Sequence, residues 1–180
     1  MYATAAEAIK KSYTLLLVSH IHPDGDAVGA LTALGAPLLA AGKKVVLYNE
    51  HPIPTPYQFL PLAETVVDDV GEIDAYDTAV ILDCSKIERI GQLADLIDQI
   101  PVIINIDHHC TNENFGGIQL VDCDACATTE IVYKLLVEMG LPITCEAAYG
   151  IYTGIITDTA SFSFENTRSD SFSICGEMVK

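Results

Sequence analysis

The chain contains few basic residues. Nine Lys and Arg residues stand against 25 Asp and Glu residues, which gives a formal net charge of −16. A protein that binds duplex nucleic acid normally needs a basic surface to displace counterions. The composition therefore argues against a broad nucleic-acid groove, whereas a short anionic substrate stays compatible if metal ions supply the positive charge. Much of the acidity is explained by solubility alone.

Long apolar segments are absent as well. No apolar run approaches the roughly 20 residues that are needed to cross a bilayer. The first residues, Met1 to Glu7, do not place a basic region before an apolar one, so they predict a short helix and not a secretory signal. We therefore expect no membrane partner and a cytoplasmic protein. No linker or internal repeat divides the 180 residues, and this length fits one domain.

The six cysteines include no second CxxC pair. Cys123 and Cys126 form a single such motif, and structural zinc would require two further ligands at matched spacing. An even number of cysteines permits disulfides, but regular apolar segments are not typical of a disulfide scaffold. Ordinary reduced thiols are the favoured interpretation, with zinc binding and redox chemistry as less favoured alternatives.

Continuous apolar runs alternate with helical segments along the chain. The strands lack a period of two, which is typical of a parallel sheet covered on both faces. The predicted fold is α/β, a doubly wound and mainly parallel sheet with helices on both faces. We expect strands over 14–19, 43–48, 79–83 and 102–106, weaker strands at 65–67 and 118–121, and helices over 27–41, 91–99, 128–139, 145–157 and 169–180.

Two of the expected helices carry more specific predictions. Pro37 predicts a kink or an early end in the helix over 27–41, and Gly42 is its expected C-cap. The helix over 145–157 is apolar on nearly all sides, which predicts that it is buried all round.

Acids and imidazoles follow several of the expected strands. In an open α/β sheet, ligands bind beyond the carboxyl ends of the strands, near the point where the strand order reverses. Four separate segments would bring their polar groups to that edge. They are His20, Asp24 and Asp26, then Asp83, then Asp107, His108 and His109, and finally Asp158.

These residue types indicate a site for divalent metal. Carboxylates with imidazoles suit manganese or magnesium, and manganese accepts histidine more readily. Four aspartates in one pocket would repel one another strongly, and two divalent ions would offset their charge. Cysteine ligands are not required.

Each segment also has an ordinary structural explanation. Asp24 could belong to a Pro-Asp-Gly turn, Asp26 could cap the helix that follows, and Asp83 could cap the next turn. A single histidine beside an apolar run is more often a core residue than a ligand. The combined pattern favours a site, because four segments would otherwise have to converge by chance. His22 and His51 lie outside the pattern, and we assign them no role.

The same residues resemble the four motifs of the DHH phosphoesterase family. The resemblance extends over residues 15–168, and its spacing is most similar to a RecJ-like subfamily that includes bacterial oligoribonucleases with 3′-phosphoadenosine-5′-phosphate phosphatase activity. The motifs read His20-x-x-x-Asp24-x-Asp26, Asp83-Cys84-Ser85, Asp107-His108-His109, and Asp158 within Thr-Asp-Thr-x-Ser-Phe.

This resemblance implies hydrolysis of a phosphoester by water activated between two metal ions. Manganese is the expected metal, with magnesium or cobalt as alternatives. Asp107 would orient a histidine from behind, and His109 would face the substrate phosphate. Arg89 is the one nearby cation that could touch a phosphate, although an arginine at a helix start could equally be solvated. One ion would be held by His20, Asp24 and Asp83, and the other by Asp26, Asp83, His108 and Asp158, with Asp83 as the bridge.

Two departures from the family pattern lower the activity that we expect of this chain. Relatives commonly have glycine and arginine where this chain has Ala160 and Ser163, so a cation near the site is missing. The family's C-terminal substrate-binding domain, with its Gly-Gly-Gly-His motif, does not occur here. We therefore expect residues 1–180 to be a metal-binding catalytic domain that hydrolyses substrate poorly when alone.

The leading hypothesis is a hydrolase for short oligonucleotides or nucleoside 3′,5′-bisphosphates. A single-strand exonuclease, a cyclic-dinucleotide phosphodiesterase and a pyrophosphatase are the alternatives within the same class. A non-catalytic metal-binding regulatory module is the alternative from another class. A homodimer is compatible with the sequence, which does not decide the oligomeric state.

Overall fold

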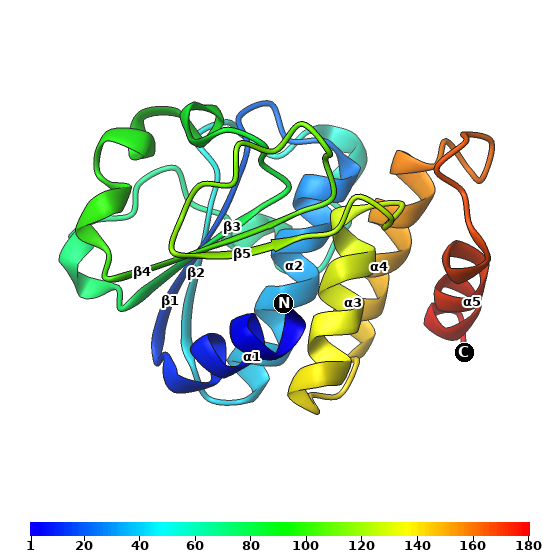
Figure 1. Cartoon of the computed structure of the whole chain (residues 1–180), viewed down its shortest axis with the longest axis horizontal. Coiled ribbons are helices and arrows are strands. Elements are labelled where there is room, and N and C mark those ends of the chain that lie inside the picture. Colours follow the sequence, from blue (N-terminus) through cyan, green and yellow to red (C-terminus); the bar gives the residue numbers. More distant parts are fainter.

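The computed structural model describes all residues from 1 to 180 and contains a five-stranded parallel sheet (Figure 1). The strand order is β2-β1-β3-β4-β5, and each neighbouring pair is parallel. The order reverses between β1 and β3, so the sheet is doubly wound and the predicted α/β fold is confirmed. The strands are β1 (Thr14–Ser19), β2 (Lys44–Tyr48), β3 (Thr78–Leu82), β4 (Val102–Asp107) and β5 (Ile118–Val121).

The α-helices gather on one side of this sheet (Figure 1). α2 contacts β1, β2 and β3, α1 and α3 contact the other end of the sheet, α4 packs on α2 and α3, and α5 lies against α4. The larger core fills this layer, where alternate strand residues such as Leu15 and Leu17 are fully buried. The helices are α1 (Tyr2–Lys11), α2 (Gly25–Ala40), α3 (Thr128–Met139), α4 (Cys145–Asp158) and α5 (Ser169–Met178).

Short 3₁₀ segments cover the opposite face of the sheet. Ile90 and Leu93 pack there against Leu16 and Val18 in a second, smaller core. The α-helix expected over 91–99 is therefore wrong: residues 87–95 and 97–99 form 3₁₀ turns. Gly91 interrupts the helical backbone with a φ of 73° and a ψ of −144°, which suit only glycine, and the hydrogen bonds that follow, such as that from the N–H of Leu96 to the carbonyl of Leu93, join residues three apart.

Three further expectations differ from the structure. The early end that Pro37 predicted is wrong, since α2 continues to Ala40, and the expected glycine, Gly42 with φ 81°, follows the end of the helix. The strand expected at 65–67 is reduced to one bridge between Tyr48 and Val67. α4 is not buried all round, since the side of the helix carrying Tyr149 (52% exposed) faces solvent. None of the helices is long and apolar enough to span a membrane.

Glycines allow α2 and α4 to approach closely. A Cβ atom at Gly29 of α2 would lie 2.5 Å from the carbonyl oxygen of Gly150, and a Cβ at Gly150 would lie 2.5 Å from that of Gly29. The contact continues where Gly25, at the start of α2, meets Thr157 near the end of α4. The beginning of α2 and the end of α4 are therefore held side by side, above the edge of the sheet where β1 and β3 end.

Candidate metal centre

Three strands deliver polar residues to the same edge of the sheet. His20 follows β1, Asp83 follows β3, and Asp107 ends β4. Two more acids approach from the helical layer: Asp24 is the N-cap of α2, and Asp158 is the last residue of α4. The structure thus brings together segments that are far apart in the sequence, at the point where the strand order reverses.

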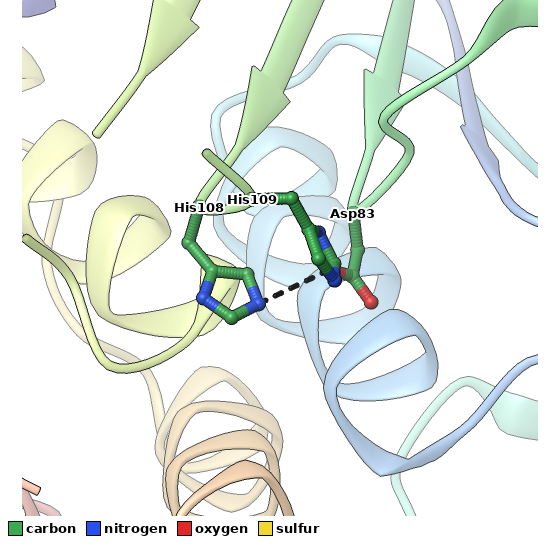
Figure 2. A group of neighbouring side chains, drawn as sticks. All are labelled: Asp83, His108 and His109. Carbon is green, nitrogen blue, oxygen red and sulfur yellow. Dashed lines mark ion pairs between the residues drawn. The ribbon is translucent and has the colours of Figure 1, made fainter. Parts of the chain in front are cut away.

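Asp83 lies at the centre of the group and is 2% exposed. Its Oδ2 is 3.4 Å from Nε2 of His20, and its Oδ1 is 3.8 Å from Nε2 of His108 and 3.7 Å from Nδ1 of His109. Figure 2 shows the last two histidines turned toward this carboxylate. Burial alone would raise the pKa of Asp83, but the neighbouring histidines outweigh burial and hold that pKa below its usual value.

His20 is oriented by its own backbone. Its Nδ1 donates a hydrogen bond to the carbonyl of Ile21 at 2.7 Å, so Nε2 is left facing the carboxylates. Nε2 lies 4.0 Å from Oδ2 of Asp24. Burial lowers the pKa of His20, but the hydrogen bond and charge of Asp83 outweigh it and the pKa is raised. A fixed imidazole nitrogen that faces two carboxylates is the usual arrangement of a metal-binding histidine.

His108 carries a buried nitrogen that no protein group satisfies. Its Nε2 has no hydrogen-bond partner, although it lies 3.6 Å from Oδ2 of Asp158 and 3.8 Å from Oδ1 of Asp83. Buried polar atoms are normally paired, and an exception needs an explanation. A cation bound between the imidazole and the two carboxylates would satisfy all three, so these residues fit a divalent metal ion.

Asp107 is fully buried and saturated by protein donors. Its Oδ1 accepts hydrogen bonds from the backbone N–H of His108 at 3.0 Å and from Nδ1 of His109 at 2.7 Å. Its Oδ2 accepts one from Nδ2 of Asn112 at 2.6 Å. The hydrogen bond to Asp107 raises the pKa of His109 to about 9. Asp107 therefore fixes the ring of His109.

Asp26 is buried against the first turn of α3. Its Oδ2 accepts a hydrogen bond from the backbone N–H of Thr128 at 2.6 Å, and its Oδ1 accepts from the N–H (3.0 Å) and Oγ1 (2.7 Å) of Thr129. The possibility that Asp26 caps the helix that follows it is therefore wrong. Asp24 caps α2, whereas Asp26 caps α3. Burial and the charges of Asp83 and Asp158 raise the pKa of Asp26 well above its usual value.

Asp158 is held from the loop that follows α4. Asn166 donates through Nδ2 to Oδ2 of Asp158 at 3.2 Å and to its carbonyl at 3.1 Å. Burial, with the charges of Asp83 and Asp24, raises the pKa of Asp158, although His108 opposes this effect. Carboxylates that raise one another's pKa in this way are stabilised by a bound cation.

The predicted residues do not all lie equally close together. The ligand atoms of His20, Asp24 and Asp83 lie within 4.8 Å of one another, and so do those of Asp83, His108 and His109. Asp26 and Asp158 lie outside these two groups, and Asp107 lies behind His109. Arg89 is half-buried beside the loop after β1, where its carbonyl accepts a hydrogen bond from the N–H of Ile21 at 2.7 Å.

Sequence reasoning gave no role to several residues that support the site. Thr128 donates through Oγ1 to Oδ1 of Asp83 at 3.0 Å, and Thr129 holds Asp26. Asn112 links Asp107 to Asn105, to which it donates at 2.8 Å. The threonines stand at the start of an expected helix, which is a usual place for a capping group. Their partners are 45 and 103 residues away, and no local pattern indicates such contacts.

Comparison with known proteins identifies relatives of most of the chain. The N-terminal domain of the DHH family matches residues 14–155. A bifunctional oligoribonuclease and PAP phosphatase, NrnA, from Thermus thermophilus is 34% identical over 168 residues, which are 92% of this chain and 49% of that protein. The chain therefore spans about half the length of this curated relative.

Solved structures share the fold. An exopolyphosphatase-related protein from Bacteroides fragilis superposes with a TM-score of 0.92 at 28% identity, over 99% of this chain and 55% of that chain. The exonuclease RecJ, in a structure bound to manganese, superposes with a TM-score of 0.60 at 18% identity, over 99% of this chain and 47% of that chain. At 18% identity, the comparison with RecJ shows only that the two proteins share a fold.

Proposed function

Since the chain belongs to the DHH family, we propose that it forms the metal-binding part of a phosphoesterase for short oligonucleotides or nucleoside 3′,5′-bisphosphates. The observation that carries this proposal is the buried Asp83 between three histidines, one of which has an unsatisfied nitrogen. The name of the Thermus relative, an oligoribonuclease and PAP phosphatase, supports the substrate class.

We propose that two divalent ions bind at this centre, with Asp83 as a ligand to both. The mutual repulsion of Asp26, Asp83 and Asp158 supports more than one positive charge here. Manganese is favoured by the mixture of imidazole and carboxylate ligands, and RecJ, which shares the fold, binds it. One ion would be held by His20, Asp24 and Asp83, and the other by Asp26, Asp83, His108 and Asp158.

Such ions, when bound, would lower the pKa of a water molecule and neutralise phosphate oxygens. The chain's own residues would position the reactants. Asp107 holds Nδ1 of His109, which leaves Nε2 of that ring free to point at a phosphate. The hydrogen bond to Asp107 raises the pKa of His109 to about 9 in the chain without metal, which favours a protonated ring that can donate a hydrogen bond to a phosphate oxygen. Arg89 is a second candidate contact for the phosphate.

Short substrates fit the chain better than long ones. A processive exonuclease must hold an extended phosphate backbone, which normally needs a positively charged groove. The formal net charge of −16 opposes that mode of binding. A dinucleotide or nucleoside bisphosphate brings few phosphates, which the two ions and His109 could neutralise.

A substrate panel in the natural full-length protein tests the proposal. With manganese present, we expect hydrolysis of dinucleotides and phosphoadenosine phosphate, and little hydrolysis of cyclic dinucleotide or pyrophosphate. A chelator should abolish the activity. A preference for pyrophosphate, cyclic dinucleotide or long single strands would replace the proposed substrate. Metal binding without any hydrolysis would instead favour a regulatory module.

A further inference from the structure

Two histidines to which the sequence assigned no role meet beside the metal centre. Nδ1 of His51 lies 3.0 Å from Nδ1 of His22 and accepts a hydrogen bond from the backbone N–H of His22 at 3.2 Å. Their ring centroids are 4.1 Å apart. His22 has a left-handed backbone with φ 56°, so the loop is turned to make this contact. Because Nδ1 of His51 accepts hydrogen bonds, its proton is on Nε2.

His51 also lines a cavity of about 630 Å³ beyond the end of β2. A volume of about 300–1,000 Å³ is usual for a small-molecule site. Its lining includes the apolar Ile53 and Val66, and Asn49, His51 and Gln58 supply polar groups.

This cavity shares a wall with the metal centre. Asn49 is 1% exposed and donates through Nδ2 to the carbonyl of His20 at 2.8 Å and to Oγ of Ser19 at 2.7 Å. β2 and β1 are neighbours in the sheet, so their ends lie about 5 Å apart. A ligand with its phosphate near His20 could therefore extend from the end of β1 to the end of β2.

The charge of the cavity selects against a second phosphate. Glu64 and Asp68 line it, and no lysine or arginine does. These carboxylates would repel an anion but can accept hydrogen bonds from amino or ring N–H groups. The imidazole of His51 offers a flat face and an Nε2–H donor. A flat, uncharged heterocycle with N–H donors matches this mixture of apolar side chains and hydrogen-bond acceptors.

We propose that this cavity binds the nucleobase of a nucleotide whose phosphate lies at the metal centre, with His51 as a base contact. This inference rests on the proposed function, because it assumes a nucleotide substrate. It assigns a role to the proline-rich segment after β2, which contributes Pro52, Ile53 and Gln58 to the lining of the cavity. It also predicts that the chain distinguishes a nucleotide from a sugar phosphate that lacks the base.

Nuclear magnetic resonance on the intact chain tests the subsite directly. Adenosine monophosphate with magnesium should shift the backbone amides of Asn49, His51 and Val67, whereas ribose 5-phosphate should shift only amides near the metal centre. His51→Ala should weaken the affinity for adenosine monophosphate, as measured from these shifts, about tenfold. Tyr13→Ala, which removes an aromatic ring that is 56% exposed and outside the cavity, should leave them unchanged.

The outcomes separate this inference from the proposed function. If both ligands give the same shifts, or if His51→Ala binds the nucleotide as the unmodified chain does, the base subsite is refuted whatever the catalytic result. If the base-specific shifts occur but the full-length protein hydrolyses no nucleotide, the subsite stands and the phosphoesterase proposal fails.

Discussion

Asp83 combines full burial with an unusual backbone conformation. Its φ of 56° places it in the left-handed region, which aspartate and asparagine tolerate better than most residues. The backbone N–H of Asp83 still bonds to the carbonyl of Ile106 at 3.0 Å, so the turn begins at the end of β3. This turn directs the carboxylate toward the three histidines, and alanine at this position would lose both the ligand and this local preference.

The hydroxyl of Thr128 gives a prediction at the same scale. It donates to Oδ1 of Asp83, so Thr128→Val should leave that oxygen free to rotate and weaken manganese binding about 10- to 100-fold. Calorimetric titration of the chain with manganese measures the change. Thr78→Val is the matched control, because Thr78 is also buried and its hydroxyl pairs with that of Ser12 at the opposite end of β3. Equal affinity in both variants would refute the positioning role of Thr128.

At the scale of elements, α2 and α4 form the most extensive contact in the fold. Gly150→Ala would place a Cβ atom 2.5 Å from the carbonyl oxygen of Gly29 and 2.7 Å from Oγ1 of Thr32. The two helices would have to separate, and we expect a loss of about 1–3 kcal/mol in the free energy of unfolding. Because α4 ends at Asp158, manganese affinity should fall as well. Urea unfolding and calorimetric titration measure the two effects.

Gly176→Ala provides the matched control for this substitution. Gly176 lies in α5, and a Cβ atom there would meet no other atom within 4 Å. Alanine should therefore stabilise the helix by about 0.5–1 kcal/mol through backbone entropy alone. If both substitutions changed stability in the same direction by the same amount, close packing of α2 on α4 would not be the cause.

Asp77 links the beginnings of β1 and β3 and gives a pH prediction. Its Oδ2 accepts hydrogen bonds from the backbone N–H groups of Tyr13 and Thr14 at 2.9 and 3.0 Å. Desolvation raises the pKa of Asp77, but these hydrogen bonds outweigh it and the pKa is lowered. A lowered pKa stabilises the fold above the unfolded value of about 3.8, and this stabilisation is lost as the pH falls through the folded pKa.

Asp77→Asn should accordingly lower the free energy of unfolding near pH 6. The difference from the unmodified chain should shrink as the pH falls below about 3.8 and through the lowered pKa of folded Asp77. Urea unfolding at several pH values measures this difference. A difference that stayed constant over the whole range would show that the charge of Asp77 is not involved.

The elements were predictable from sequence to the extent that their signals are local. The apolar runs indicated the major strands, and the alternation with helices indicated the parallel sheet. The α-helix expected over 91–99 is wrong because this segment forms 3₁₀ turns, a distinction that hydrophobic periodicity does not reveal. The strand expected at 65–67 failed because this segment pairs with β2 at Val67 alone.

Sequence motifs predicted only those residues of the candidate site that the motifs themselves contain. The structure places His20, Asp83 and His108 together as the strand ends suggested. The contacts of Thr128 with Asp83 and of His51 with His22 join distant segments, so they depend on the fold and on no local pattern.

At the scale of the whole molecule, the chain has an excess of negative charge, and the acids of the candidate metal centre are part of it. The acids of the centre lie at the ends of two helices and of packed strands, so the fold itself brings their negative charges together. The chain carries a formal net charge of −16. Bound cations are therefore expected to stabilise the folded chain as well as to support hydrolysis.

The central claim is that Asp83 joins two metal ions in one centre. Calorimetric titration of the chain with manganese tests it most directly, with Asp83→Asn, which keeps the side-chain shape and the tolerance for a left-handed backbone. Asp98→Asn, an exposed position in the 3₁₀ segment 97–99, is the control. We predict two ions for the unmodified chain and for Asp98→Asn, and loss of tight binding at both sites in Asp83→Asn. One ion or none in the unmodified chain, or two ions in Asp83→Asn, would contradict the account.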